Sequence, residues 1–125
     1  MRLLEIHLEV SDIEQSLQLY SKLIPHKRIK IWTDKSAVAL ILKDGSAFGL
    51  WQKGKLGVHD GRGGEHVHFA FEIKPDEYDG CVSRIKLAGL QPKEHVWPTG
   101  HKSVYFFDYD NNQGEFMTTD WENNT

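Results

Sequence analysis

Acidic and histidine side chains share one face of strand-like segments near the start and the middle of the sequence. Within residues 2–10 and 66–73 they alternate with apolar residues. Because successive side chains of a strand point to opposite faces, each polar set lies together, opposite the apolar set. Carboxylates and imidazoles bind divalent metals and transfer protons. The polar residues of these faces are Glu5, His7, Glu9, His66 and His68, and Glu115 lies on a third such segment.

Two interpretations of these polar faces are open. An antiparallel sheet commonly packs one face and exposes the other, so the residues could simply be solvated. Composition favours a site instead, because the faces carry Glu and His almost without cations, whereas a solvated face usually also mixes in Lys, Thr, Ser and Arg. Two carboxylates about 4 Å apart repel by on the order of 4 kcal/mol at an effective dielectric near 20, which favours uptake of a proton or cation. A bound divalent metal would supply that charge.

The elements that position these side chains occur in the same order twice, which predicts an α+β fold of two βαβββ modules. The first module has an expected helix over 11–24 and strands over 2–10, 28–33, 37–42 and 47–52. The second has an expected helix over 75–88 and strands over 66–73, 93–97, 102–108 and 113–119. The repeat rests on this pattern, because sequence identity between the halves is faint.

Capping signals and apolar stripes define the two expected helices. Ser11 and Glu14 have capping-box spacing at the start of the first helix, while Pro75 opens the second and Gly89 ends it. Cys81 falls among apolar residues of the second helix and is expected to be a buried, unreactive thiol. The expected stripes are Ile13, Leu17, Tyr20 and Ile24 in the first helix and Tyr78, Val82 and Ile85 in the second.

Length and charge limit the class of protein. The 125 residues suit a single domain over 1–125, divided into a module at 1–52, a linker at 53–65, a module at 66–119 and a tail at 120–125. A net charge of −3 and a pI near 6.1 give no basic surface for nucleic acid. No apolar run is long enough to span a membrane, and the N-terminus is unlike a signal peptide, so we expect a cytoplasmic protein.

Three segments together resemble the vicinal oxygen chelate superfamily, which includes glyoxalase I, fosfomycin-resistance thiol transferases, extradiol dioxygenases and bleomycin-resistance proteins. The run EIHLEVSD, from Glu5, is similar to the first strand of that family as it enters its helix, and HFAFEI, from His68, to the strand that opens its second half. The run SVYFFDYDNNQGE, ending at Glu115, resembles the final hairpin before a ligand Glu. Tyr109 and Asn111 replace the usual Pro and Gly of that turn. The resemblance covers nearly the whole chain and implies a cup-shaped half-barrel, the glyoxalase/bleomycin resistance/dihydroxybiphenyl dioxygenase fold.

The same resemblance implies a set of metal ligands. The family positions fall on Glu5, Gly49, His68 and Glu115, with His7 facing the same way two residues after Glu5. Gly49 lacks the carboxylate that serves as ligand and proton shuttle in glyoxalase I, so that activity is disfavoured. Three ligands, Glu5, His68 and Glu115, remain for a divalent ion (Mn, Ni, Zn, Fe or Co), and whether Glu5 or His7 is the first of them is open.

Two functions follow from the resemblance. One is a metalloenzyme that chelates vicinal oxygens of a small substrate, as a lyase, thiol transferase or dioxygenase, with Glu5 and His7 as catalytic residues. The alternative is a metal-free protein of the bleomycin-resistance type that sequesters a small molecule. The resemblance also implies a homodimer. The residues expected to line the substrate pocket are Trp51, His66, His101, Tyr105 and Met117.

Overall fold

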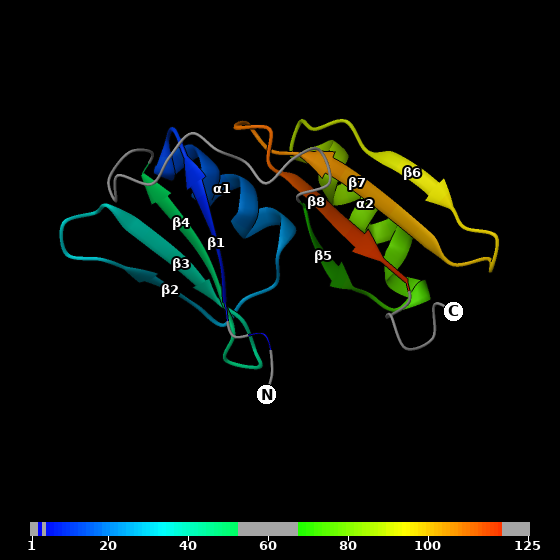
Figure 1. The fold of residues 1–125 in the computed structure, drawn as a ribbon, viewed down its shortest axis with the longest axis horizontal. Helices are drawn as coiled ribbons and strands as arrows, with labels where there is room; N and C mark the ends of the chain where they lie inside the picture. The colour runs from blue at the N-terminus through cyan, green and yellow to red at the C-terminus, as the bar shows by residue number, and fades with distance from the viewer. Residues whose placement is uncertain (1–2, 4, 53–67, 119–125) are drawn as a thin grey trace. The chain divides into compact units, whose positions relative to one another are not determined.

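The computed structural model describes residues 3, 5–52 and 68–118 and divides the chain into two compact units, Met1–Gly61 and Arg62–Thr125. Each unit has a four-stranded mixed sheet with a helix across one face (Figure 1). The predicted βαβββ order is confirmed in both units. The expected linker at 53–65 and tail at 120–125, together with His66, lie outside the described residues.

The first unit has the strand order β1-β4-β3-β2. Strand β1 pairs in parallel with β4, and the other neighbours are antiparallel. Leu50 and Phe48 of β4 are buried, as is Tyr20 of the helix, whose ring lies 4.8 Å from that of Phe48. Gly49 and Trp51 alternate with them and belong to the opposite face, which also carries Glu5 and His7. The elements are β1 (Glu5–Val10), α1 (Ile13–Leu23), β2 (Arg28–Ile31), β3 (Ala37–Ile41) and β4 (Ala47–Gln52).

The start of α1 differs from the expectation. The N-cap is Asp12, whose side chain accepts a hydrogen bond from the backbone N–H of Gln15 at 3.0 Å, so the prediction of Ser11 was wrong. Both residues are good caps by type, and the cap lies one residue later than expected. Ser11 instead uses its backbone carbonyl, which accepts from the Gln52 side chain at 2.9 Å.

The buried stripe of α1 is also only partly the expected one. Tyr20 and Ile24 are buried, as predicted, but Ile13 and Leu17 are only half-buried. The buried face is shifted from the expected stripe, because Ser16, Leu19 and Leu23 are buried beside Tyr20. The buried residues of α1 are Ser16, Leu19, Tyr20 and Leu23.

The second unit repeats this plan, with strand order β5-β8-β7-β6 and a parallel β5–β8 pair. Pro75 opens a 3-10 turn rather than the α-helix itself, which begins at Tyr78. Gly89 ends the helix with φ of 83°, and Asn111 takes φ of 61° in the predicted final turn, a region that Asn tolerates. The elements are β5 (His68–Glu72), η1 (Pro75–Glu77), α2 (Tyr78–Leu87), β6 (Lys93–Val96), β7 (Lys102–Phe107) and β8 (Gln113–Met117).

Aromatic rings fill the core of the second unit. Phe106 of β7 is fully buried, and its ring lies 6.1 Å from that of Phe69 and 5.8 Å from that of Phe116. The predicted stripe of α2 is confirmed, because Tyr78, Val82 and Ile85 are all buried. The predicted burial of Cys81 is also confirmed, and burial raises the pKa of its thiol. These side chains hold β5 and β8 in fixed register, and those two strands carry His68 and Glu115.

Candidate functional site

His68 and Glu115 form an ion pair within the second unit. In the parallel register of β5 and β8, Ala70 lies beside Glu115, so His68 is its diagonal neighbour on the same face. The distance from His68 Nε2 to Glu115 Oε1 is 3.3 Å. The structure therefore brings together the two residues that matched the family motif best.

The Glu115 carboxylate is buried and only partly satisfied. Its side chain is 2% exposed, whereas that of His68 is 37% exposed. Over the residues that the structure describes, Glu115 Oε2 accepts no hydrogen bond. A buried polar atom without a partner costs about 1–3 kcal/mol, and more where the group is charged. The site thus has a buried carboxylate oxygen and a neighbouring imidazole to offer to a cation, which are ligands suited to a divalent metal.

Tyr105 borders this pair. It lies opposite Glu115 in the β7–β8 register, and its ring centroid is 6.4 Å from that of His68. Burial raises the pKa of its phenol, and the negative charge of Glu115 raises that pKa further. Tyr105 therefore stays protonated to higher pH than an ordinary tyrosine and can donate a hydrogen bond beside Glu115. Its expected role in lining a substrate pocket stays a prediction.

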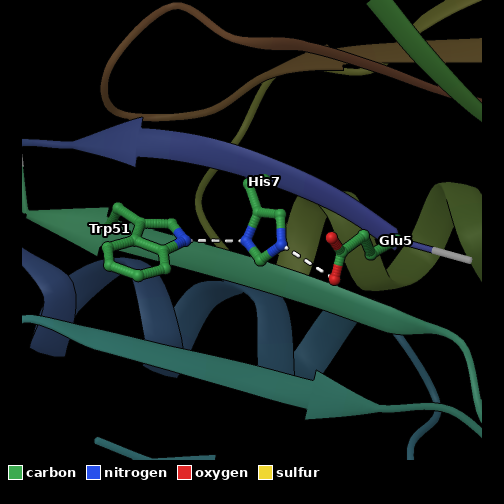
Figure 2. Close-up of polar contacts among 3 residues, drawn as sticks. All are labelled: Glu5, His7 and Trp51. Carbon is green, nitrogen blue, oxygen red and sulfur yellow. Dashed lines mark hydrogen bonds and ion pairs between the residues drawn. The ribbon is translucent and has the colours of Figure 1, made fainter. Parts of the chain in front are cut away.

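A second polar set lies in the first unit and joins Glu5, His7 and Trp51 (Figure 2). The indole Nε1 of Trp51 donates to His7 Nδ1 at 2.7 Å, and His7 Nε2 lies 3.1 Å from Glu5 Oε2. The side chain of His7 is 33% exposed and that of Glu5 53%. The two predicted catalytic residues are therefore in direct contact, and Trp51, predicted to line the pocket, orients one of them.

Gly49 is part of the same arrangement. It pairs with His7 in the β1–β4 register, and a Cβ added at Gly49 would lie 2.2 Å from His7 Nδ1. No side chain can occupy position 49 while the His7 ring keeps this place. The absence of the family carboxylate thus coincides with an imidazole over the same backbone position, a relationship that the sequence alone did not reveal.

The two units match position by position through these registers. Glu5 corresponds to His68 and Gly49 to Glu115, since each pair is offset by two residues in a parallel pairing. His7 then corresponds to Ala70. In the first unit the large His7 lies beside the small Gly49. In the second unit the small Ala70 lies beside the large Glu115, so the large and small residues have exchanged strands.

Two of the other predicted pocket residues, Met117 and His101, belong to the second unit. Met117 lies two residues after Glu115 on β8 and is 8% exposed. His101 stacks on Trp97, with ring centroids 5.6 Å apart, and its side chain contacts Thr99. In the described part of the chain, no three His, Cys, Asp or Glu side chains gather into a metal-binding group. The ligand set of Glu5, His68 and Glu115 therefore remains a prediction.

Comparison of sequences finds similarity to a known protein over part of the chain. No model of a known protein family matches the sequence. The chain is 46% identical over 46 residues to the fosfomycin resistance protein FosX of Listeria innocua, a segment that spans 35% of each chain. No helix among residues 3, 5–52 and 68–118 is long and apolar enough to cross a membrane.

Solved structures are similar over most of the chain. FosX from Listeria monocytogenes has a TM-score of 0.77 at 25% identity, covering 97% of this chain and 93% of that one. A glyoxalase/dioxygenase from Nostoc punctiforme has a TM-score of 0.72 at 21% identity, covering 93% and 89%. The Listeria monocytogenes FosX has also been solved as a mutant with Mn(II) and 1S,2S-dihydroxypropylphosphonic acid. These likenesses confirm the predicted fold class.

Proposed function

We propose that this chain, which has the fold of the vicinal oxygen chelate superfamily, is a metal-dependent enzyme acting on a small molecule through two neighbouring oxygen atoms. Its relatives of the same fold include FosX and a glyoxalase/dioxygenase. The proposed ligands are His68 and Glu115 of the second unit and Glu5 of the first. His7 contacts Glu5 directly and is not counted among the proposed ligands.

The observation that carries this proposal is the state of Glu115. A carboxylate that is 2% exposed, with one oxygen 3.3 Å from His68, is costly in a protein that has no use for it. Its second oxygen accepts no hydrogen bond within the described residues. A divalent cation would satisfy this oxygen and offset the cost of burying the charge.

The residues present fit such a cation. Imidazole suits Zn, Fe, Ni and Cu, while carboxylates suit Mn and Mg, so one His with two Glu favours an ion that accepts both. When bound, the metal would polarise substrate oxygens and stabilise negative charge that develops on them. Mn(II) is the first candidate, because FosX binds it in crystals. Tyr105, held protonated beside Glu115, donates its hydrogen bond to that carboxylate and would help to fix it as a ligand.

The proposed substrate class is a small molecule with two adjacent oxygen functions. The FosX ligand 1S,2S-dihydroxypropylphosphonic acid contains a vicinal diol and a phosphonate. It is therefore the first compound to test with this chain, together with fosfomycin. We also propose, from the family resemblance, that the chain works as a homodimer in the cytoplasm.

The test is calorimetric titration of 1S,2S-dihydroxypropylphosphonic acid into the chelated protein and into the protein reloaded with Mn(II). Binding that requires Mn(II) and disappears in His68→Ala supports the proposal. Fosfomycin turnover, followed by ³¹P NMR with the same two samples, would then identify the reaction. The control is His95→Ala, since His95 lies on β6 and its ring packs against that of Trp97.

The competing function is metal-free sequestration of a small molecule. Gly49 favours it, because a family ligand position is empty, and so does the ring pair of Trp32 and Trp51, whose centroids are 5.8 Å apart. The same titration separates the two functions. Equal affinity in chelated and Mn(II)-loaded protein, together with loss of binding in Trp32→Ala, would favour sequestration and contradict the enzyme proposal.

A further inference from the structure

The hydrogen bonds of His7 define which of its nitrogens carries a proton. The indole N–H of Trp51 can only donate, so His7 Nδ1 accepts at 2.7 Å. A neutral imidazole has one proton, which then lies on Nε2 and points at Glu5 Oε2, 3.1 Å away. Both ring nitrogens of His7 are thus engaged within its own sheet (Figure 2).

This arrangement opposes metal binding by His7. A histidine ligand gives the lone pair of one nitrogen to the metal and keeps a proton on the other. If His7 Nε2 bound a metal, its proton would have to move to Nδ1, where it would face the N–H of Trp51. Two donors would then point at each other. Glu5 has no such restriction, because it is 53% exposed and the ion pair with His7 uses one of its two oxygens.

Gly49 makes the arrangement possible. Its hydrogen atom leaves room for the imidazole, whereas a Cβ would lie 2.2 Å from Nδ1 and 2.7 Å from Cε1 of His7. Real Cβ atoms essentially never come so close to another heavy atom, so the ring would have to move. The position of the imidazole, and with it the direction of Nε2–H, therefore depends on glycine at position 49.

The ring of Trp32 packs against the indole of Trp51, which holds His7. The ring of Trp32 lies 5.8 Å from that of Trp51 at an angle of 47°. Lys30 Nζ lies 4.7 Å from the ring centroid of Trp32, a distance suited to a cation–π contact. These contacts form a continuous row of side chains across the sheet, from β2 to β1, in which each side chain contacts the next. The members of the row are Lys30, Trp32, Trp51, His7 and Glu5.

We infer that His7 is a positioning residue: held by Trp51 across Gly49, it orients the Glu5 carboxylate, and Glu5 rather than His7 is the ligand from β1. The identity of the ligand rests on the proposed function. The contacts that join Trp51, His7 and Glu5 are made by side chains of the chain itself and involve no metal. The two parts can therefore be tested separately.

The first experiment is NMR of the histidine ring nitrogens and the tryptophan indole N–H groups in metal-free protein. Trp51→Phe should change the ¹⁵N shifts of the His7 ring, because Nδ1 loses its donor, while ring packing is kept. Trp32→Phe is the matched control and should leave the His7 shifts near their wild-type values. Gly49→Ala should displace the ring and change them as well. Unchanged His7 shifts in Trp51→Phe would overturn the positioning role.

The second experiment is Mn(II) titration, monitored by electron paramagnetic resonance. Loss of a residue that orients a ligand typically costs 10–100-fold in metal affinity, so His7→Leu and Trp51→Phe should each weaken binding by about tenfold. His7→Gln keeps a donor near the Nε2 position and should recover most of that loss. Glu5→Ala should weaken binding more than His7→Leu does.

Failure of the inference about His7 can be distinguished from failure of the proposed function. If His7→Leu removes Mn(II) binding at least as fully as Glu5→Ala, and Trp51→Phe has no effect, His7 is the ligand and the inference is overturned. If the wild-type protein takes up no Mn(II), the proposed function and the role of Glu5 as ligand both fail. The NMR result then decides alone whether Trp51 and Gly49 position the His7 ring.

Discussion

The His68 imidazole lies 3.3 Å from a Glu115 carboxylate that is almost completely buried, and the second oxygen of that carboxylate accepts no hydrogen bond from the described residues. The fold places this pair on the sheet face opposite to α2, between β5 and β8. The aromatic core beneath those strands keeps them in register. Changes to that core are therefore expected to act on stability, and changes to the pair on metal binding.

Gly114→Ala tests the packing beneath the pair. A Cβ at Gly114 would lie 2.3 Å from Cζ of Phe106 and 2.8 Å from Cζ of Phe69, and both rings are buried. Overpacking of this kind costs typically about 1–3 kcal/mol, which chemical denaturation would measure. The matched control is Gly80→Ala in α2, where nothing lies within 4 Å of the added atom, so alanine should stabilise the helix by up to about 1 kcal/mol. Equal effects of the two changes would contradict the packing described.

Asp12→Ala tests the start of α1. Asp12 accepts the hydrogen bond from the backbone of Gln15, so its removal should lower the free energy of unfolding by about 1 kcal/mol. Ser11→Ala should change it by less than about 0.5 kcal/mol, because the Ser11 side chain does not cap the helix. A larger loss in Ser11→Ala than in Asp12→Ala would restore Ser11 as the cap.

Tyr78 predicts an alkaline pH dependence of stability. Burial, followed by its hydrogen bond to Glu94, raises the pKa of Tyr78 from 10.0 to about 12. Because the folded state holds this proton more tightly than the unfolded state, the stabilisation is complete below pH 10 and is lost as the pH rises to about 12. Thermal melts between pH 9 and 12 should show a steeper loss of stability in the wild type than in Tyr78→Phe, which has no proton to lose. Parallel curves for the two proteins would contradict this.

The element order could be predicted from the sequence because it depends on local pattern, whereas His68 and Glu115 were identified as candidate ligands through the family resemblance. Alternation identifies the strands, and the turn before Glu115 resembles a known motif closely enough to align it. The start of α1 was misplaced because Ser11 and Asp12 are equally good caps by residue type. Only the backbone, which uses the Ser11 carbonyl for Gln52, distinguishes them.

The contacts of His7 could not be predicted in the same way. They depend on the parallel register that sets His7 beside Gly49 and Glu9 beside Trp51, and on the side-chain rotamers of His7 and Trp51. Residues 44 positions apart in the sequence carry no local signal of such a hydrogen bond. From the sequence, Gly49 appears only as a missing ligand, whereas in the fold it is the space that the His7 imidazole requires.

The most direct test of the central claim is a thermal melt of the chelated protein with and without added Mn(II), in the wild type and in Glu115→Gln. The claim predicts that Mn(II) raises the melting temperature of the wild type. It also predicts that the wild type retains one Mn(II) ion for each set of the proposed ligands. It also predicts that chelated Glu115→Gln melts at or above the chelated wild type, since a buried charge is removed, and gains nothing from Mn(II). No shift in the wild type, or an equal shift in both proteins, would contradict a metal site at Glu115.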